Sequence, residues 1–176
     1  INYLTAIKTV TITTTCLDKN TYVYIWDRKK KRKLKRKIKY LKKDDIVYSY
    51  DYESGTYVTT KIKNVTINKT KEIYHLIFDN DEIKTTATHA FCIKGMGYVD
   101  AALLKTGYEI IGQDGKTYPI KEIKKEFLKE DQDMYCLELD NNNTSFMVGK
   151  NGIVCLSMYI SALAVIALMP RKVLAY

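Results

Sequence analysis

The chain has 176 residues, of which 46% are hydrophobic and 28% are charged, and its formal net charge is +9. This length fits one domain with a proper core, or two half-domains that share a core, so folding needs no disulfides. The four cysteines, at positions 16, 92, 136 and 155, lack the close C-x-x-C spacing of zinc or redox sites, and we expect neither a metal nor a cofactor. We therefore expect a reducing, cytoplasmic setting with one reactive thiol and the other thiols buried.

The positive charge is confined to one segment. Twelve of the 29 basic residues lie within residues 28–43, which hold no acid, so the rest of the chain carries 17 basic against 20 acidic residues, a net charge of −3. This distribution excludes a broad basic face. Two interpretations stay open: a solvated β-hairpin, or a hairpin that binds phosphate or nucleic acid, although interleaved aromatic residues are scarce there.

In chain order, the sequence predicts short β-strands separated by turns. Thr9–Thr15 alternates β-branched residues and leads into Cys16, and Thr21–Trp26 alternates likewise. Further strands are expected at Ile46–Tyr50, Tyr57–Val65, Ile73–Asp79, Glu82–Thr86, Phe91–Lys94, Gly97–Val99, Glu109–Gly112, Tyr118–Ile120, Met134–Leu139, Phe146–Val148 and Ile153–Leu156. Turn sequences such as Lys150-Asn151-Gly152 separate them, and only Ala101–Lys105 predicts a helical turn. The body is thus all-β.

The end of the chain changes character, because residues 153–169 carry no charge. A bilayer span needs at least about 17 apolar residues, but the first four of these residues are expected in the last strand. We therefore expect a short buried or partner-binding helix at Met158–Met169, with a membrane span as the alternative. The start at Ile1, without a secretory segment, is expected of a fragment.

An internal repeat underlies the body. Thr60–Asn80 aligns with Lys121–Asn141 at an offset of 61 residues, so that the Tyr-His-Leu sequence around His75 answers the Tyr-Cys-Leu sequence around Cys136. Residues 41–47 align with residues 104–110 at an offset of 63. Two pairs in the same order indicate a duplicated unit of about 60 residues, and hence two interlocked subdomains rather than a solenoid.

The residues that carry chemistry are Cys16 and, 73 positions later, His89 in a Thr-x-x-His sequence that begins at Thr86. A thiol becomes a useful nucleophile when a partner holds its thiolate or protonates its leaving group. We therefore interpret Cys16 as a nucleophile and His89 as a proton donor. His75, Cys92 and Cys155 are expected to pack in the core, with a position of His75 near the site by pseudo-symmetry as the alternative.

These motifs resemble those of the Hint superfamily, the self-processing domains of inteins, bacterial intein-like domains and Hedgehog proteins. The likeness covers five motifs in order, at Cys16–Val23, Ile83–Phe91, Gly97–Gly107, Tyr135–Leu139 and Phe146–Val154. The resemblance implies an all-β horseshoe of two pseudo-symmetric duplicated subdomains with a short C-terminal helix. It also implies a processing domain at residues 16–157 between flanking segments 1–15 and 158–176.

The resemblance further implies the chemistry. Cys16 would attack the carbonyl of Thr15 and turn the Thr15–Cys16 peptide bond into a thioester, while His89 protonates the departing nitrogen and Thr86 holds the scissile unit. Relatives often carry an Asp where this chain has Cys136, which is a candidate for proton traffic, with a buried core thiol as the alternative. The substrate would be the chain's own flanking segments, the acyl acceptor a small nucleophile, and the acting species a monomer outside the membrane that turns over once.

The pattern fails at the C-terminal end. A splicing intein ends in His-Asn, because the Asn side chain cyclises to release the downstream segment, yet no Asn follows Asn151 in this chain. The two expected positions fall on Leu156 and Ser157, or the Asn position falls on Tyr159 if the final loop is longer. We expect N-terminal cleavage or acyl transfer without splicing. The alternatives are an inert Hint-fold linker or interaction module and a nucleic-acid-binding domain that uses the basic hairpin 28–43.

Overall fold

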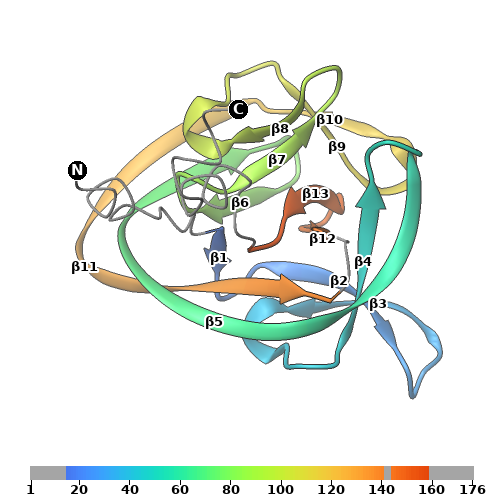
Figure 1. The fold of residues 1–176 in the computed structure, drawn as a ribbon. Coiled ribbons are helices and arrows are strands. Elements are labelled where there is room, and N and C mark those ends of the chain that lie inside the picture. Colours follow the sequence, from blue (N-terminus) through green and yellow to red (C-terminus); the bar gives the residue numbers. More distant parts are fainter. Residues whose placement is uncertain (1–14, 141–143, 159–176) are drawn as a thin grey trace, which may run out of the picture. The chain divides into compact units, whose positions relative to one another are not determined.

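Short strands around two long ones make up the fold. The computed structural model describes residues 15–140 and 144–158, and within these ranges it contains thirteen β-strands, three 3-10 turns and no α-helix (Figure 1). The first six strands are β1 (Cys16–Asp18), β2 (Tyr22–Asp27), β3 (Arg32–Lys37), β4 (Ile46–Asp51), β5 (Thr56–Ile77) and β6 (Glu82–Thr85). The others are β7 (Ala90–Ile93), β8 (Gly97–Asp100), β9 (Glu109–Ile111), β10 (Thr117–Pro119), β11 (Glu122–Leu139), β12 (Ser145–Val148) and β13 (Ile153–Leu156). The turns are η2 (Ile38–Tyr40), η3 (Ala101–Leu103) and η4 (Gln113–Gly115).

The strand pairing repeats itself in the two halves of the chain. In the first half β2 pairs with β3 and leads through η2 to β4 and the long β5; in the second half β7 pairs with β8 and leads through η3 to β9 and the long β11. The first strand of each half pairs with the long strand of the other half, β1 with β11 and β6 with β5. The duplicated unit predicted from the sequence is thus present as two interlocked halves.

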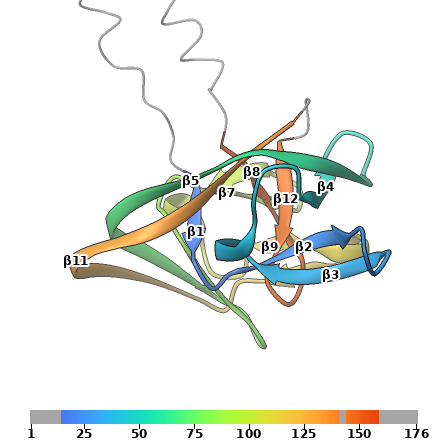
Figure 2. The same cartoon turned by 90° about the horizontal axis from the view of Figure 1, so that it is seen from below.

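The two halves meet along two antiparallel pairs. β5 and β11 run side by side over most of their length, and β1 and β6 pair at Leu17 and Thr85 (Figures 1 and 2). A pseudo-two-fold rotation that exchanges the two halves places β1 on β6 and β5 on β11. The rotation axis therefore passes between the two strands of each pair. Cys16 opens the first of these strands, and Thr86 and His89 follow the last residue of its counterpart β6.

The strand β5 is longer than the sequence indicated. Tyr57–Val65 and Ile73–Asp79 were expected as separate strands, whereas the structure joins them into one strand of 22 residues. The polar sequence between them, residues 66–72, offers no apolar alternation. It stays extended because its backbone pairs with β11, from Thr66 opposite Cys136 to Glu72 opposite Phe127, with one irregularity between Phe127 and Gln132. Backbone hydrogen bonds to a neighbouring strand need no apolar side chain.

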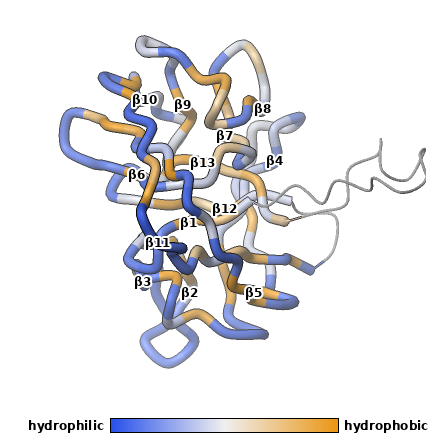
Figure 3. The backbone as a smooth tube through the Cα atoms, turned by 90° about the vertical axis from the view of Figure 1, so that its left-hand side faces the viewer, coloured by the Kyte–Doolittle hydropathy of each residue, from blue (hydrophilic) through white to orange (hydrophobic). Residues whose placement is uncertain are grey.

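One large apolar cluster holds the halves together. It draws residues from both halves and from the final hairpin β12–β13, among them the fully buried Leu17, Val23, Ile62, Leu76, Phe91, Ile110, Leu137 and Ile153. Buried and more exposed positions alternate along β4 and β6, whereas β7, β12 and β13 are buried at every position; Figure 3 colours the chain by hydropathy. Because alternation with period two fixes which side chains face the core, the register of β4 and β6 is strongly specified.

The all-β fold is confirmed, and the helical turn expected at Ala101–Lys105 is the 3-10 turn η3. Most of the strand predicted at Thr9–Thr15 and nearly all of the helix predicted at Met158–Met169 lie outside the described residues. Within the described ranges, no helix has the length and apolar character that a membrane crossing requires.

Candidate functional site

The site lies where the first strands of the two halves meet. β1 carries Cys16, and the segment that follows β6 carries Thr86 and His89. Leu17 pairs with Thr85 across the β1–β6 ladder, which brings the neighbouring residues together although 70 positions separate Cys16 from Thr86. The structure thus unites Cys16, Thr86 and His89, all three buried, in one place.

The backbone of Cys16 is held on both sides by threonines. The amide N–H of Cys16 donates to the hydroxyl oxygen of Thr86, with N and Oγ1 3.1 Å apart. The carbonyl oxygen of Cys16 accepts from the backbone N–H of Thr86 at 3.1 Å and from the hydroxyl of Thr85 at 3.2 Å. The Cys16 nitrogen belongs to the predicted scissile bond, so Thr86 contacts the atom that would leave. Thr85 was not singled out from the sequence, and only its position next to Thr86 could have indicated it.

His89 is clamped between two carbonyl oxygens. Nδ1 lies 3.3 Å from the carbonyl oxygen of Cys16, and Nε2 lies 2.8 Å from that of Leu156. Burial lowers the pKa of His89 to about 4, although both carbonyls act to raise it. The imidazole is therefore neutral at pH 7 and has one N–H for two acceptors. The His89 ring contacts the carbonyl oxygen of Cys16.

Cys136 lies directly opposite Cys16. The two residues are paired in the β1–β11 ladder, their Cα atoms are 4.3 Å apart, and a disulfide joins their sulfur atoms. This differs from the sequence-based expectation of a free reactive thiol. The reason is the antiparallel register, which places two cysteines 120 residues apart in sequence on one face of neighbouring strands. Cys136 is therefore in contact with the candidate nucleophile itself.

The end of the final strand also reaches the site. Leu156, the last residue of β13, supplies the carbonyl oxygen that His89 contacts. Ser157 is buried and its hydroxyl donates to the carbonyl oxygen of Thr144 at 2.9 Å, while the N–H of Met158 donates to Leu137 at 2.7 Å. One imidazole thus contacts Cys16, at the first predicted junction, and Leu156, one residue before Ser157 at the second.

A cavity of about 210 Å³ opens beside the site, and its walls include Thr86, Thr88 and Asn68. Thr15 is 2% exposed and Cys16 is fully buried, so bulk water does not bathe the predicted scissile bond. The amide nitrogen of Asn68 lies 3.7 Å from the sulfur of Cys16 and 3.5 Å from that of Cys136. Asn68 was not singled out from the sequence, because it stands in the polar stretch of β5 that has no motif.

The remaining candidate groups lie elsewhere. Cys92 and Cys155 are free and buried, and burial raises the pKa of the Cys92 thiol to about 11 and raises that of Cys155 as well. His75 does not pack into the core as expected: its Nδ1 lies 2.7 Å from a carboxylate oxygen of Glu82, and its Nε2 lies 3.7 Å from one of Glu126. Within residues 15–140 and 144–158, no group of three or more His, Cys, Asp and Glu side chains could hold a metal ion.

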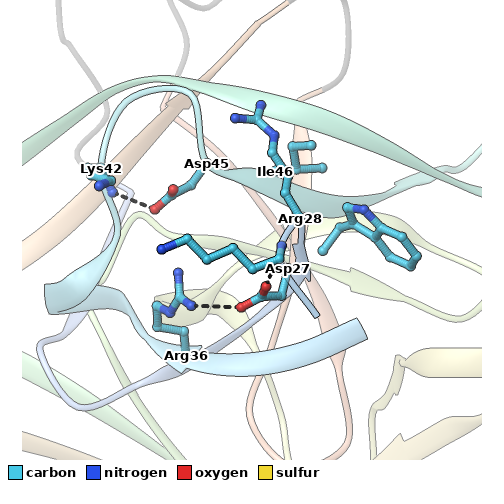
Figure 4. A pocket seen from close by; sticks show the side chains of 8 residues that line it. Asp27, Arg28, Arg36, Lys42, Asp45 and Ile46 are labelled. Carbon is cyan, nitrogen blue, oxygen red and sulfur yellow. Dashed lines mark hydrogen bonds and ion pairs between the residues drawn. The ribbon is translucent and has the colours of Figure 1, made fainter. Parts of the chain in front are cut away.

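The basic segment, residues 28–43, forms the turn between β2 and β3, the strand β3 and the 3-10 turn η2 that follows it. Beside the hairpin β2–β3 lies a cavity of about 240 Å³, lined by four cationic side chains and two acidic ones (Figure 4). The acids are already engaged: Asp27 accepts from the backbone N–H groups of Lys29 and Lys30 and lies 3.3 Å from Arg36, and these contacts lower its pKa. Asp45 accepts from the backbone N–H of Lys42 at 3.0 Å.

On the hairpin, lysine ammonium groups also lie over tyrosine rings. Lys33 is 4.9 Å from the ring centre of Tyr24, and Lys37 is 5.9 Å from that of Tyr22. These rings come from the neighbouring strand β2, so aromatic residues are closer to the cations than the sequence of the segment alone indicated. Within the described ranges, no hydrogen bond or ion pair joins these lysines to the site around Cys16.

Solved structures with the same fold include an intein-like domain and inteins. A bacterial intein-like domain from Clostridium thermocellum matches with a TM-score of 0.68 at 22% identity, covering 80% of this chain and all of that domain. A DnaB intein from Synechocystis sp. PCC 6803 matches with a TM-score of 0.67 at 16% identity, covering 82% of this chain and 99% of the intein. An intein from a hyperthermophile matches with a TM-score of 0.68 at 16% identity, covering 81% and 99%. At such identities the likeness establishes the fold.

Two interlocked β halves with a cysteine and a Thr-x-x-His sequence at their junction define a Hint-type domain, as the resemblance implied and the matching family model supports. More narrowly, residues 33–155 match the model of the pretoxin HINT domain, and the chain belongs to that family. The matched range contains Thr86, His89 and Cys136, whereas Cys16 precedes it. Among curated proteins, none matches the chain. Self-processing is the class of function that this family membership supports.

Proposed function

We propose that this domain activates the peptide bond between Thr15 and Cys16 by an N-to-S acyl shift, with Cys16 as nucleophile. The observation that carries the proposal is the contact of the Thr86 hydroxyl with the Cys16 nitrogen at 3.1 Å. An amide is a poor leaving group, and a hydroxyl fixed on its nitrogen can donate a proton once the nitrogen loses its amide character.

In the proposed step the Cys16 thiolate attacks the carbonyl carbon of Thr15. A C–S bond forms, the bond from that carbon to the Cys16 nitrogen breaks, and the nitrogen takes up the proton that the thiol gave up. The donors on the Cys16 carbonyl, Thr85 and the Thr86 backbone, fix the residue during this exchange. Such positioning accounts for a large part of the rate in intramolecular reactions.

His89 is proposed to carry the proton. A neutral imidazole with a pKa of about 4 takes up a thiol proton only transiently, and it then faces two carbonyl acceptors, one for each N–H of the imidazolium. Because one of these acceptors belongs to Cys16, the charged imidazole forms next to the residue whose nitrogen must be protonated.

Reduction of the disulfide between Cys16 and Cys136 must precede attack, because a sulfur bonded to another sulfur is not a nucleophile. After reduction, Cys136 is proposed to stay as the neighbouring thiol that exchanges protons with Cys16. The thioester is then open to a small nucleophile that enters the cavity beside Thr86. Without an Asn at the C-terminal junction, the outcome is N-terminal cleavage or acyl transfer without splicing.

The test follows the intact mass of the purified chain in the presence of a phosphine reductant with and without hydroxylamine. The phosphine opens the disulfide without accepting the acyl group, and hydroxylamine cleaves a thioester. We expect a fragment that ends at Thr15 only when both are present. Absence of this fragment, while circular dichroism reports an intact β fold, would leave the inert-module interpretation in place.

Three variants assign the roles in the same assay. Cys16→Ala removes the nucleophile and should abolish the fragment. His89→Ala should abolish it as well, and Thr86→Val, which keeps the shape but not the hydroxyl, should slow its formation by about a hundredfold or more, in the range of removing a proton-transfer group. Cleavage in Cys16→Ala would contradict a thioester route.

A further inference from the structure

Cys16 needs a group that stabilises its thiolate, and the contacts of His89 and Thr86 described above are made with backbone atoms, not with its sulfur. The side chain of Cys16 lies in an apolar cluster with Ile73, Met134 and Cys136, at whose edge Leu128 and Met158 pack. Apolar surroundings disfavour a buried anion. Elsewhere in this molecule the consequence is visible, because burial raises the pKa of the thiols of Cys92 and Cys155.

The polar groups of the site are committed to backbone atoms. The His89 nitrogens face the carbonyl oxygens of Cys16 and Leu156, and the Thr86 hydroxyl takes the Cys16 N–H. Among the described residues, the side chain that hydrogen-bonds the sulfur of Cys16 is Asn68, with its Nδ2 3.7 Å from that sulfur and 3.5 Å from the sulfur of Cys136. An amide group carries two N–H donors, so one side chain can serve both sulfurs.

The register of three strands explains this contact. In the sheet β5–β11–β1, Thr66 faces Cys136, and Cys136 faces Cys16. Asn68 lies two residues along β5 from Thr66, which places both side chains on the same face of the sheet. Cys136 on β11 is therefore the diagonal neighbour of Asn68, and the asparagine side chain is long enough to reach it. Asn68 also lines the cavity that borders Thr86, so it lies between the sulfurs and the route of entry.

We propose that Asn68 is a further catalytic residue, which donates its amide N–H groups to the thiolate of Cys16 and thereby raises the fraction of the reactive form. The proposal rests on the proposed function for its role in cleavage, but the contact itself can be tested separately. Once the C–S bond to Thr15 forms, the charge leaves the sulfur, so Asn68 acts on the thiolate and not on the leaving nitrogen.

Other titratable groups of the described residues neighbour Cys16 on its own strand and on the elements beside it. They are Asp18 on the same strand, Lys69 and Glu72 on β5 beside the cavity, Tyr135 and Cys136 on β11, and His89 after β6. Within the described ranges, none of the charged side chains among them hydrogen-bonds the sulfur of Cys16. A change of thiolate stability caused by Asn68 should therefore appear directly in the pH dependence of the reaction.

The variants Asn68→Leu and Asn68→Asp test the proposal, with Asn64→Leu, on an exposed position of the same strand, as the matched control. Under reducing conditions, we expect Asn68→Leu to form the Thr15 fragment about tenfold more slowly at neutral pH, as for loss of a hydrogen bond to a charged group. Its rate should rise with pH and approach that of the wild type in alkali. Asn68→Asp, which keeps the shape but replaces the donor by an anion, should be slower still, and Asn64→Leu should be unchanged.

A second readout does not depend on cleavage. In a Cys136→Ala background, the rate at which iodoacetamide alkylates Cys16 is measured against pH, and we expect Asn68→Leu and Asn68→Asp to displace this profile to higher pH. A displaced profile without any cleavage in the wild type would support Asn68 and sink the proposed function. Normal cleavage with an undisplaced profile in Asn68→Asp, folded by circular dichroism, would overturn the proposal for Asn68.

Discussion

At the scale of single residues, His89 combines two opposed influences. Two carbonyl oxygens favour the imidazolium, yet full burial disfavours it more and lowers the pKa to about 4. The imidazolium of His89 has a carbonyl acceptor for each of its N–H groups, but burial makes it unfavourable to form. These two properties suit a group that holds a proton only briefly. A histidine that stayed charged would already have used both N–H groups before the reaction began.

The pKa of His89 predicts how stability depends on pH. The unfolded chain binds the proton with a pKa near 6.5 and the folded chain with a pKa of about 4, so the unfolded state holds more protons between these values. The stability is complete above about pH 6.5 and decreases as the pH falls towards 4, by about 3 kcal/mol for a shift of this size. Urea unfolding of the wild type from pH 7 to pH 4 should therefore show a steeper loss than His89→Gln. Parallel curves would contradict the assignment of this loss to His89.

Single residues also mark the limit of what the sequence predicts. Cys16, Thr86 and His89 could be selected because motif and residue type agree, and the structure brings them together. Thr85 and Asn68 could not be selected from the sequence, because their contacts with Cys16 depend on the registers of β6 and β5. The register of a strand depends on its partner strand as well as on its own sequence. The disulfide has the same origin, since Cys16 and Cys136 meet only through the β1–β11 pairing.

At the scale of elements, the hairpin β2–β3 is separate from the site. Its lysines stack on Tyr22 and Tyr24, and its arginines contact Asp27 and the carbonyl oxygen of Asp44. Within the described ranges, no hydrogen bond or ion pair joins these side chains to Cys16, Thr86 or His89, and exposed charges without such contacts are largely screened at physiological salt. The hairpin charges should therefore contribute little to the chemistry at Cys16.

The triple variant Lys33→Gln, Lys35→Gln, Lys37→Gln tests this separation. We expect the rate of formation of the Thr15 fragment to be unchanged within error. The same pair of proteins, titrated with labelled single-stranded and duplex DNA at physiological salt, decides the nucleic-acid interpretation of the hairpin: binding that the triple variant loses would support it, and binding by neither protein leaves a solvated hairpin.

The position of the end of β13 predicts that cleavage after residue 157 becomes possible once Leu156 and Ser157 are replaced. The carbonyl of Leu156 contacts His89, and Leu156 and the buried Ser157 stand at the positions where splicing relatives are expected to carry His and Asn. In Leu156→His/Ser157→Asn, the new amide nitrogen can attack its own carbonyl carbon and break the bond to Met158. We expect mass spectrometry to reveal a fragment that begins at Met158, and the single variant Leu156→His to lack it. A folded double variant without this fragment would mean that the geometry of β13 does not suit cyclisation.

The sequence predicts short elements better than long ones. The alternating residues of β2 and β4 and the short apolar run of β12 are visible in the sequence, and these strands occur where expected. The middle of β5 and the first part of β11 are polar and exposed, and they become strands because each serves as the other's partner. The repeat predicted two halves, but only the structure reveals that the halves exchange their first strands.

At the scale of the whole molecule, the site occupies the pseudo-two-fold axis. Cys16 begins one half, and Thr86 and His89 follow the equivalent strand of the other half, so neither half contains a complete site. Any change that separates the halves should therefore affect stability and self-processing together. The disulfide is the exception, because it links the halves while it blocks the nucleophile.

This exception leads to a prediction with opposite signs for stability and activity. The disulfide joins residues 120 positions apart, and a covalent link that closes a loop of about this size restricts the unfolded chain by about 3 to 5 kcal/mol. Reduction by the phosphine should lower the unfolding free energy by that amount and at the same time allow the Thr15 fragment to form on addition of hydroxylamine. The variant Cys136→Ala, with no partner for Cys16, should have the lower stability with or without reductant. With hydroxylamine it should form the fragment in both cases, more slowly than the reduced wild type because the proton-exchanging thiol is missing. Equal denaturation midpoints for the oxidised and reduced wild type would contradict this coupling, since Cys92 and Cys155 are free and offer the reductant no other bond to break.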